Sequence, residues 1–178
     1  MLEKPGAEER PTICAVASPA GTGERAVLRL SGPRTRGLLL SCCDSTDGGE
    51  LVLGGREHLE VRFDDGRGGL PARLLWMPGP RSFTREDVGE LHLPGHPALV
   101  AAALERLLAL GAEPAGPGEF TRRAFENGRI DLTRAEGILA LVHARGRDER
   151  RAATALLAGG LDERLAGCLL YTSDAADE

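Results

Sequence analysis

The sequence predicts an α+β fold, in which a small mixed or antiparallel sheet with flanking helices precedes the beginning of an all-helical domain. Three observations support this prediction. Alternating apolar runs typical of strands fill the chain from about residue 12 to residue 93. Apolar residues at helical spacing dominate from residue 97 onward. Hydrophobic residues make up 42% of the 178 residues, which is enough to form a core.

The expected strands are short and end at turn residues. Residues 26–31 alternate, so Val27 and Arg29 share one face and Leu28 lies on the other. The stretch 64–69 is a hairpin turn signal between two such runs. We expect strands at residues 12–17, 26–31, 58–63, 70–77 and 88–93, with another short strand between the glycine pairs at 48–49 and 54–55.

Helices are expected mainly in the second half of the chain. Pro97 suits a first helical position, and Gly111 suits the end of that helix. Thr133 and Glu136 have the spacing of a capping box at the start of a later helix. Its expected buried side is Ile138, Leu139, Leu141 and Val142. The other expected helices are 35–41, 98–110, 119–127 and 148–157.

These patterns divide the chain into four segments. Residues 1–11 form a lead-in that we expect to be disordered and that lacks the apolar region of a signal peptide. Residues 12–118 form the first domain, and residues 119–167 begin the helical one. Residues 168–178 do not continue the preceding pattern and resemble translated adapter sequence from library preparation. We expect this tail to be non-native and the protein to continue past it; a frayed natural end is the alternative.

Composition excludes several classes of protein. A net charge of −5 argues against a dedicated nucleic-acid coat, and no apolar run is long enough to cross a bilayer. The four cysteines form no C-x-x-C pair, so we expect reduced thiols in a cytoplasmic protein. His92 and His96 cannot form a helical metal pair because proline and glycine lie between them. Lys4 is the only lysine, so the chain contains no Walker A motif.

Three charged residues are candidate ligand contacts. Arg29 lies mid-strand, so it either faces water on an edge strand or binds a partner, because an unpaired buried charge is costly. Glu90 also lies in an expected strand, where it could accept two parallel hydrogen bonds from an amidine-like N–H pair or form an internal ion pair. Arg129 follows a tight turn and could face an anionic ligand or water. The pattern alone leaves each choice open.

Three blocks of sequence, in order, resemble the MnmE (TrmE) family of tRNA-modifying GTPases. The first block is TICAVASPAGTG at residues 12–23 with LRLSG at 28–32. The second is PGPRSFTREDVGELH at 78–92, and the third and most specific is PGEFTRRAFENGRIDLTRAE at 117–136. The resemblance covers residues 12 to about 165, which corresponds to the family's amino-terminal domain and the start of its helical domain.

The resemblance implies a specific function for residues 12–118. The family's amino-terminal domain binds a reduced folate such as 5-formyl-tetrahydrofolate, forms a homodimer, and resembles the folate-binding part of glycine-cleavage T proteins. The family's folate contacts fall on Arg29, Glu90 and Arg129. At the position of Arg129, the family frequently has lysine instead. A carboxylate for the pterin edge and cations for an anionic tail form a chemically sensible set.

The resemblance also implies a role for the whole protein. With an MnmG-type flavoprotein, the family adds an aminomethyl-type group at C5 of the wobble uridine of certain tRNAs, using carbon from folate. Potassium-dependent hydrolysis of magnesium-bound GTP occurs in a central domain that this sequence does not contain. We therefore expect this chain to hydrolyse nothing alone, and its own enzymatic status is open.

One departure from the family pattern leaves alternatives open. After Glu90 the family usually has a His-Gly-Gly-Pro run, whereas this chain has Leu93-Pro-Gly-His-Pro97. The chain could therefore be a degenerate, purely structural dimerisation module that does not bind folate. A one-carbon enzyme of the glycine-cleavage T kind is a third option, which the short length and the second and third blocks oppose.

Overall fold

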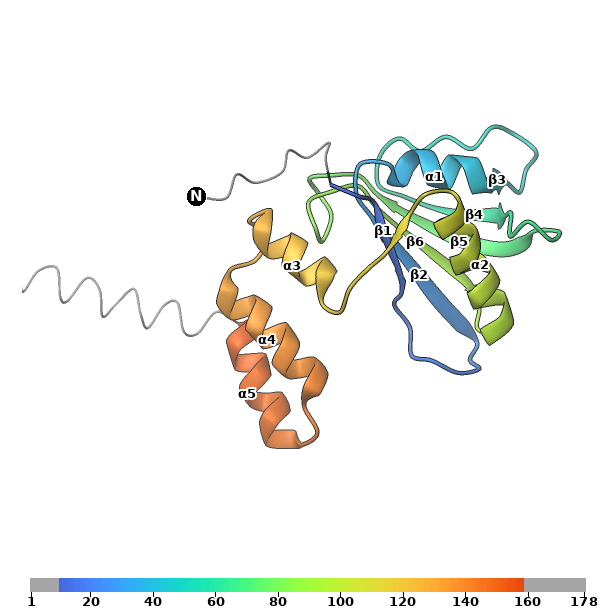
Figure 1. Ribbon diagram of the computed structural model, residues 1–178. Coiled ribbons are helices and arrows are strands. Elements are labelled where there is room, and N and C mark those ends of the chain that lie inside the picture. Colours follow the sequence, from blue (N-terminus) through green and yellow to red (C-terminus); the bar gives the residue numbers. More distant parts are fainter. Residues whose placement is uncertain (1–9, 159–178) are drawn as a thin grey trace, which may run out of the picture. The chain divides into compact units, whose positions relative to one another are not determined.

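The computed structural model describes residues 10–158 and divides the chain into two compact units (Figure 1). The unit that we call the sheet unit ends at Phe120, and the helical unit begins at Thr121. Most of the predicted lead-in 1–11 and the whole predicted tail 168–178 lie outside the described residues, as do residues 159–167 of the predicted helical segment.

The sheet unit contains a seven-stranded sheet in the order β3-β4-β5-β6-β2-β1-β7. Neighbouring strands pair antiparallel, except that β1 and β7 are parallel. The strands are β1 Ile13–Val16, β2 Arg25–Ser31, β3 Cys43–Ser45, β4 Glu57–Phe63, β5 Leu70–Met77, β6 Val88–Pro94 and β7 Glu113–Pro114. The predicted α+β class with a mixed, mainly antiparallel sheet is confirmed.

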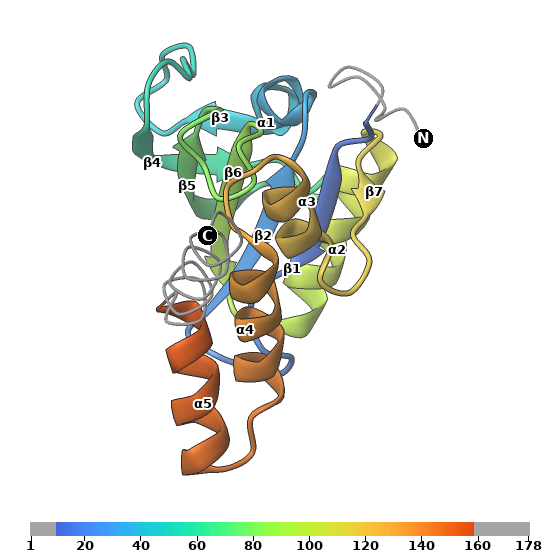
Figure 2. The same cartoon turned by 90° about the vertical axis from the view of Figure 1, so that its left-hand side faces the viewer.

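Two helices of this unit, α1 (Thr35–Cys42) and α2 (Pro97–Ala109), pack on one face of the sheet (Figure 2). The core beneath them contains apolar side chains of the central strands that are fully buried, including Leu28, Leu74 and Leu91. Alternation along the strands places the other side chains on the opposite face. There they remain partly exposed, and several are charged. We call this side of the central strands the polar face.

One predicted strand is wrong. The structure has no strand between Gly48 and Gly55, and the short strand β3 lies before this stretch. Strand β3 pairs with β4, with Cys43 opposite Phe63. The glycine-rich stretch has no partner strand and is anchored instead by Leu53, which is 1% exposed. Pairing with β4, rather than the position of the local glycines, therefore decides where the short strand β3 forms.

The helical unit contains α4 (Leu132–His143) and α5 (Arg147–Leu157), and α3 (Glu119–Glu126) spans the boundary between the units. The predicted capping box at the start of α4 is wrong, because Asp131 is the N-cap and its side chain accepts a hydrogen bond from the Arg134 N–H. Asp131 satisfies one of the backbone donors that a helix start leaves unpaired.

The predicted buried side of α4 is mostly exposed within the described residues. Leu139 and Val142 are 58% and 75% exposed, and Leu141 is also exposed. The buried residue on α4 is Gly137, which packs closely against Leu156 and Leu157 of α5. The close contact between the two helices therefore lies at Gly137 rather than on the predicted side.

Two further properties follow from the described residues. None of their helices combines the length and apolar character needed to cross a membrane. The cysteines at positions 14, 42 and 43 are free and buried, and burial raises the pKa of the Cys14 thiol to about 11. The Cys14 thiol therefore stays protonated and packs as a small apolar group.

Candidate functional site

Arg29 and Glu90 meet on the polar face of the sheet. They lie opposite each other on the neighbouring strands β2 and β6. Arg29 Nε donates a hydrogen bond of 2.7 Å to Glu90 Oε1. The side chains are 34% and 16% exposed, so the pair is partly shielded from water but remains accessible. Because β2 is flanked by β6 and β1, the edge-strand interpretation of Arg29 is wrong. Glu90 thus forms an internal ion pair, which is one of the two alternatives that the sequence left open for it.

Phe120 forms the second side of this site. The Arg29 guanidinium carbon lies 5.6 Å from the centroid of the Phe120 ring, within the range of a cation–π contact. Phe120 is the last residue of the sheet unit, and it follows the Pro117-Gly118 turn. Sequence reasoning did not select Phe120, although the third block contains it in a chain that is only 3% aromatic. The site therefore combines a carboxylate, a guanidinium and an aromatic ring.

His92 is the third neighbour of the ion pair. Its Nε2 lies 3.5 Å from Glu90 Oε2, which is too long for a strong hydrogen bond. The Nε2 atom is buried, and within the described residues it has no hydrogen-bond partner. Both oxygens of Glu90 therefore face nitrogen atoms, one on each side. Residues 10–158 contain no group of His, Cys, Asp and Glu side chains suited to a metal.

A network of hydroxyl and carboxylate groups fixes the loop that enters β6. The Oγ atoms of Ser31 and Thr84 lie 2.7 Å apart, and Ser31 also donates to Glu86 Oε2 at 2.7 Å. The Gly79 N–H donates to Asp87 Oδ1 at 2.9 Å. Ser31 ends β2, so this network ties the two strands that carry the ion pair. It joins Ser31 of the first block to the second block, close to the start of the strand that carries Glu90.

The altered run Leu93–Pro97 lies at the opposite end of β6. The Gly23 N–H donates to the Gly95 carbonyl at 2.8 Å, and the Gly95 N–H donates to the Glu24 carbonyl at 3.4 Å. A Cβ atom at Gly95 would collide with the Gly23 backbone, so only glycine fits there. The departure from the family pattern therefore lies at the end of β6, where it contacts the loop between β1 and β2, and Glu90 keeps its place in the middle of β6.

Arg129 lies in the helical unit, after the turn that ends α3. Its N–H donates to the Ala124 carbonyl at 2.8 Å, and Gly128 supplies the positive φ of 69° that the turn requires. Of the three predicted contacts, the structure brings Arg29 and Glu90 together. Arg129 follows a turn whose backbone is held by this hydrogen bond to α3.

Comparison with known proteins identifies the family. Residues 12–129 match the family model described as GTP-binding protein TrmE N-terminus. The chain belongs to this family. The TrmE amino-terminal match includes all three predicted ligand contacts, and it covers both strands of the ion pair.

Curated relatives of the TrmE family support the assignment. The chain is 46% identical over 165 residues to the tRNA modification GTPase MnmE of Halorhodospira halophila. It is 49% identical over 152 residues to the protein of that name from Paramagnetospirillum magneticum, and 42% identical over 153 residues to that of Phenylobacterium zucineum. These matches cover 84–90% of this chain but 33% of each relative. The chain thus spans about a third of the length of these relatives.

Proposed function

We propose that this chain is the folate-binding and dimerising amino-terminal part of a tRNA modification GTPase. The observation that carries this proposal is the carboxylate of Glu90, held on the polar face beside Arg29 and Phe120. A carboxylate can accept the paired N–H groups at one edge of a pterin, and an aromatic ring favours stacking against a flat heterocycle. A reduced folate such as 5-formyl-tetrahydrofolate offers both features.

The proposed site contains Arg29, Glu90 and Arg129, and the proposed domains are residues 12–118 for folate binding and 119–167 for the start of the helical domain. In the complete protein, a GTPase domain that uses potassium and magnesium would act with an MnmG-type flavoprotein. Together they would form the aminomethyl-type group at C5 of the wobble uridine of tRNA, in the cytoplasm. The names and the length of the curated relatives support this role.

Calorimetric titration with 5-formyl-tetrahydrofolate tests the proposal. We expect one site per chain, and Glu90→Gln should weaken binding by about 100-fold, because the acceptor loses its charge and one of its two oxygens is replaced by an NH2 donor. Glu105→Gln is a matched control, since Glu105 is 72% exposed and pairs loosely with Arg67 at 3.8 Å. Absence of heat with the unaltered chain, or equal affinity of Glu90→Gln, would disprove folate binding at this site.

A structural dimerisation module without folate is the second candidate. Arg29 already occupies one oxygen of Glu90, so the ion pair is complete without a ligand. The run at Leu93–Pro97 also departs from the family pattern. This candidate predicts a dimer in light scattering whose stability does not respond to folate. A ligand at 100 times its Kd should instead add about 2.7 kcal/mol to the free energy of unfolding.

A further inference from the structure

The solvent-exposed side of α5 carries a row of arginines. Arg147 is followed three and four residues later by Arg150 and Arg151, a spacing that places all three on one side of the helix. All three are exposed. Leu156, which packs against Gly137 of α4, lies on the other side of α5 (Figure 2). We call Arg147, Arg150 and Arg151 the arginine face.

The guanidinium groups of the arginine face form no ion pair or hydrogen bond with residues 10–158. The acidic residues of α5 are Asp148 and Glu149, and both lie outside the side of the helix that carries the three arginines. Glu149 accepts a hydrogen bond of 2.6 Å from the Arg145 backbone N–H. The positive charge of the arginine face is therefore not neutralised by the part of the chain that the structure describes.

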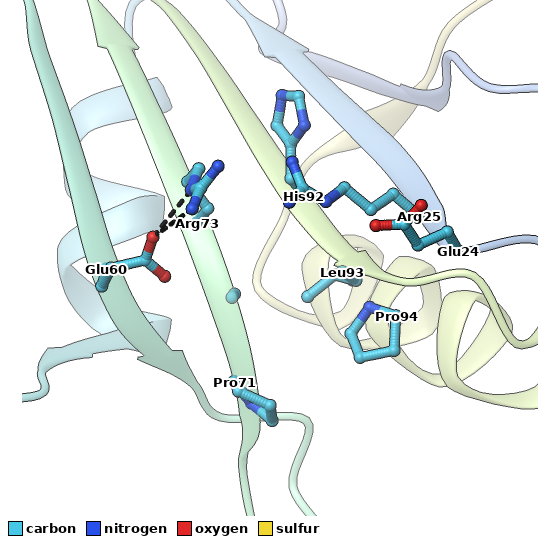
Figure 3. A pocket seen from close by; sticks show the side chains of 9 residues that line it. Glu24, Arg25, Glu60, Pro71, Arg73, His92, Leu93 and Pro94 are labelled. Carbon is cyan, nitrogen blue, oxygen red and sulfur yellow. Dashed lines mark hydrogen bonds and ion pairs between the residues drawn. The ribbon is translucent and has the colours of Figure 1, made fainter.

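Several arginines of the sheet unit are paired instead. Arg73 of β5 is held by Glu60 of β4 at 2.7 Å (Figure 3), and Arg29 is held by Glu90 at the same distance. The whole chain has 27 acidic and 22 basic residues, so carboxylates are plentiful. Three neighbouring arginines without a carboxylate partner are thus a local property of α5 and not a result of composition.

The position of the arginine face also opposes the dipole of its helix. Helix α5 begins at Arg147, so the three arginines all lie within its first five residues. The N-terminal end of a helix carries a partial positive charge, which disfavours cations there. Like charges one turn apart repel each other as well. Residues that oppose a local rule in this way without a compensating internal contact are typical of functional sites.

We infer that the arginine face binds the phosphate backbone of a folded RNA, which in the complete protein would be the tRNA. Arginine presents planar pairs of N–H donors that match phosphate oxygens, and a row of cations suits a row of phosphates. The arginine face includes no large apolar side chain, whereas a protein interface usually has apolar or aromatic anchors at its centre. The inference rests on the tRNA-modifying role in the proposed function and is independent of folate binding.

Fluorescence anisotropy of a labelled tRNA transcript, titrated with the 178-residue chain, tests the inference. The test variant combines Arg147→Gln, Arg150→Gln and Arg151→Gln. At about 50 mM salt, we expect its affinity to be about ten- to hundredfold lower, because three charged contacts to phosphate are lost. The slope of log affinity against log salt concentration should become shallower by about 2 to 3, since each phosphate contact contributes just under one.

The matched control removes the same charge from the sheet unit. It combines Arg36→Gln, Arg67→Gln and Arg81→Gln, which replace three exposed arginines on separate segments. We expect its affinity for the tRNA to stay within about threefold of that of the unaltered chain, because screening weakens distant charges. Circular dichroism should show that the test variant keeps its helices, since the arginine face makes no internal contact that folding needs.

Three outcomes would overturn the inference. The unaltered chain could fail to bind the tRNA, the test variant could bind as tightly as the unaltered chain, or both triple variants could lose affinity equally. Polyglutamate serves as a competitor at the same concentration of charge as unlabelled tRNA. If it displaces the labelled tRNA equally well, the arginine face recognises acidic polypeptides and the assignment to RNA is wrong. The folate titration is separate, so either proposal can fail while the other stands.

Discussion

The sheet unit and the helical unit differ in how well apolar periodicity predicts burial. In the sheet unit, the alternating residues Leu28 and Leu30 of β2 are both 0% exposed. In the helical unit, Leu139 and Val142 of α4 share the predicted buried side, yet more than half of each side chain is exposed. Periodicity predicts which side chains share a face, but burial requires another element to cover that face. The helices α1 and α2 cover one face of the sheet, whereas the predicted buried side of α4 is left uncovered at Leu139 and Val142.

The largest test of this comparison is a matched pair of helix substitutions. Leu107 of α2 is 0% exposed and Leu139 of α4 is 58% exposed. Leu107→Ala should lower the free energy of unfolding of the sheet unit by about 2–5 kcal/mol, because it leaves a cavity in the core. Leu139→Ala should change the stability of the helical unit by no more than about 0.5 kcal/mol. Chemical denaturation measures both values.

The chain provides separate signals for the two units. Trp76 is the single tryptophan and lies buried in β5, so its fluorescence reports unfolding of the sheet unit. Circular dichroism at the helical band also records the helical unit. If Leu139→Ala cost as much as Leu107→Ala, the exposed side of α4 would be a packed surface, and the contrast between the units would disappear.

Much of the fold could be predicted because local patterns decide it. Alternation in residues 26–31 and 58–63 indicates strands β2 and β4, and the turn signal at 64–69 indicates the hairpin that joins β4 to β5. The two-residue strand β7 was not predicted, because it exists only through its parallel pairing with β1. Strand order is a property of distant pairing and leaves no local signal.

The candidate site could be predicted only in part for the same reason. Arg29 and Glu90 attract attention because each is a charge within an apolar strand. Their direct contact depends on the register of β2 with β6, which joins residues 61 positions apart. The roles of Phe120 and His92 depend on the same register and on the turn before α3. A single sequence does not contain these distances.

A smaller test compares two helical glycines. A Cβ atom at Gly137 would lie 3.1 Å from both Leu156 Cβ and the Leu157 backbone nitrogen, whereas a Cβ at Gly37 of α1 meets nothing within 4 Å. Gly37→Ala should stabilise the sheet unit by about 0.5–1 kcal/mol, the usual gain in a helix. Gly137→Ala should instead destabilise the helical unit by about 1 kcal/mol, because overpacking exceeds that gain. Thermal unfolding followed by circular dichroism and by Trp76 fluorescence distinguishes the two effects.

The opposite result at Gly137 would alter the comparison between the units. A stabilising Gly137→Ala would mean that α4 and α5 separate by a few tenths of an ångström without cost. The contact at Gly137 that joins them would then be loosely packed, and the helical unit would differ from the sheet unit in its contact surface as well as in its exposed side.

The smallest test concerns the backbone of the loop before β6. Arg85 has a φ of +61°, a left-handed conformation that side chains with a Cβ atom adopt at some cost. We compare Arg85→Gly with Arg85→Ala, since both remove the guanidinium and only alanine keeps the Cβ. Arg85→Gly should be the more stable of the two by up to about 1 kcal/mol in Trp76 fluorescence. Because Arg85 lies between Thr84 and Glu86 of the network that fixes β6, equal stability would mean that this loop relaxes its backbone when the side chain is removed. The register that places Glu90 beside Arg29 would then depend on the pairing of β2 with β6 rather than on the loop.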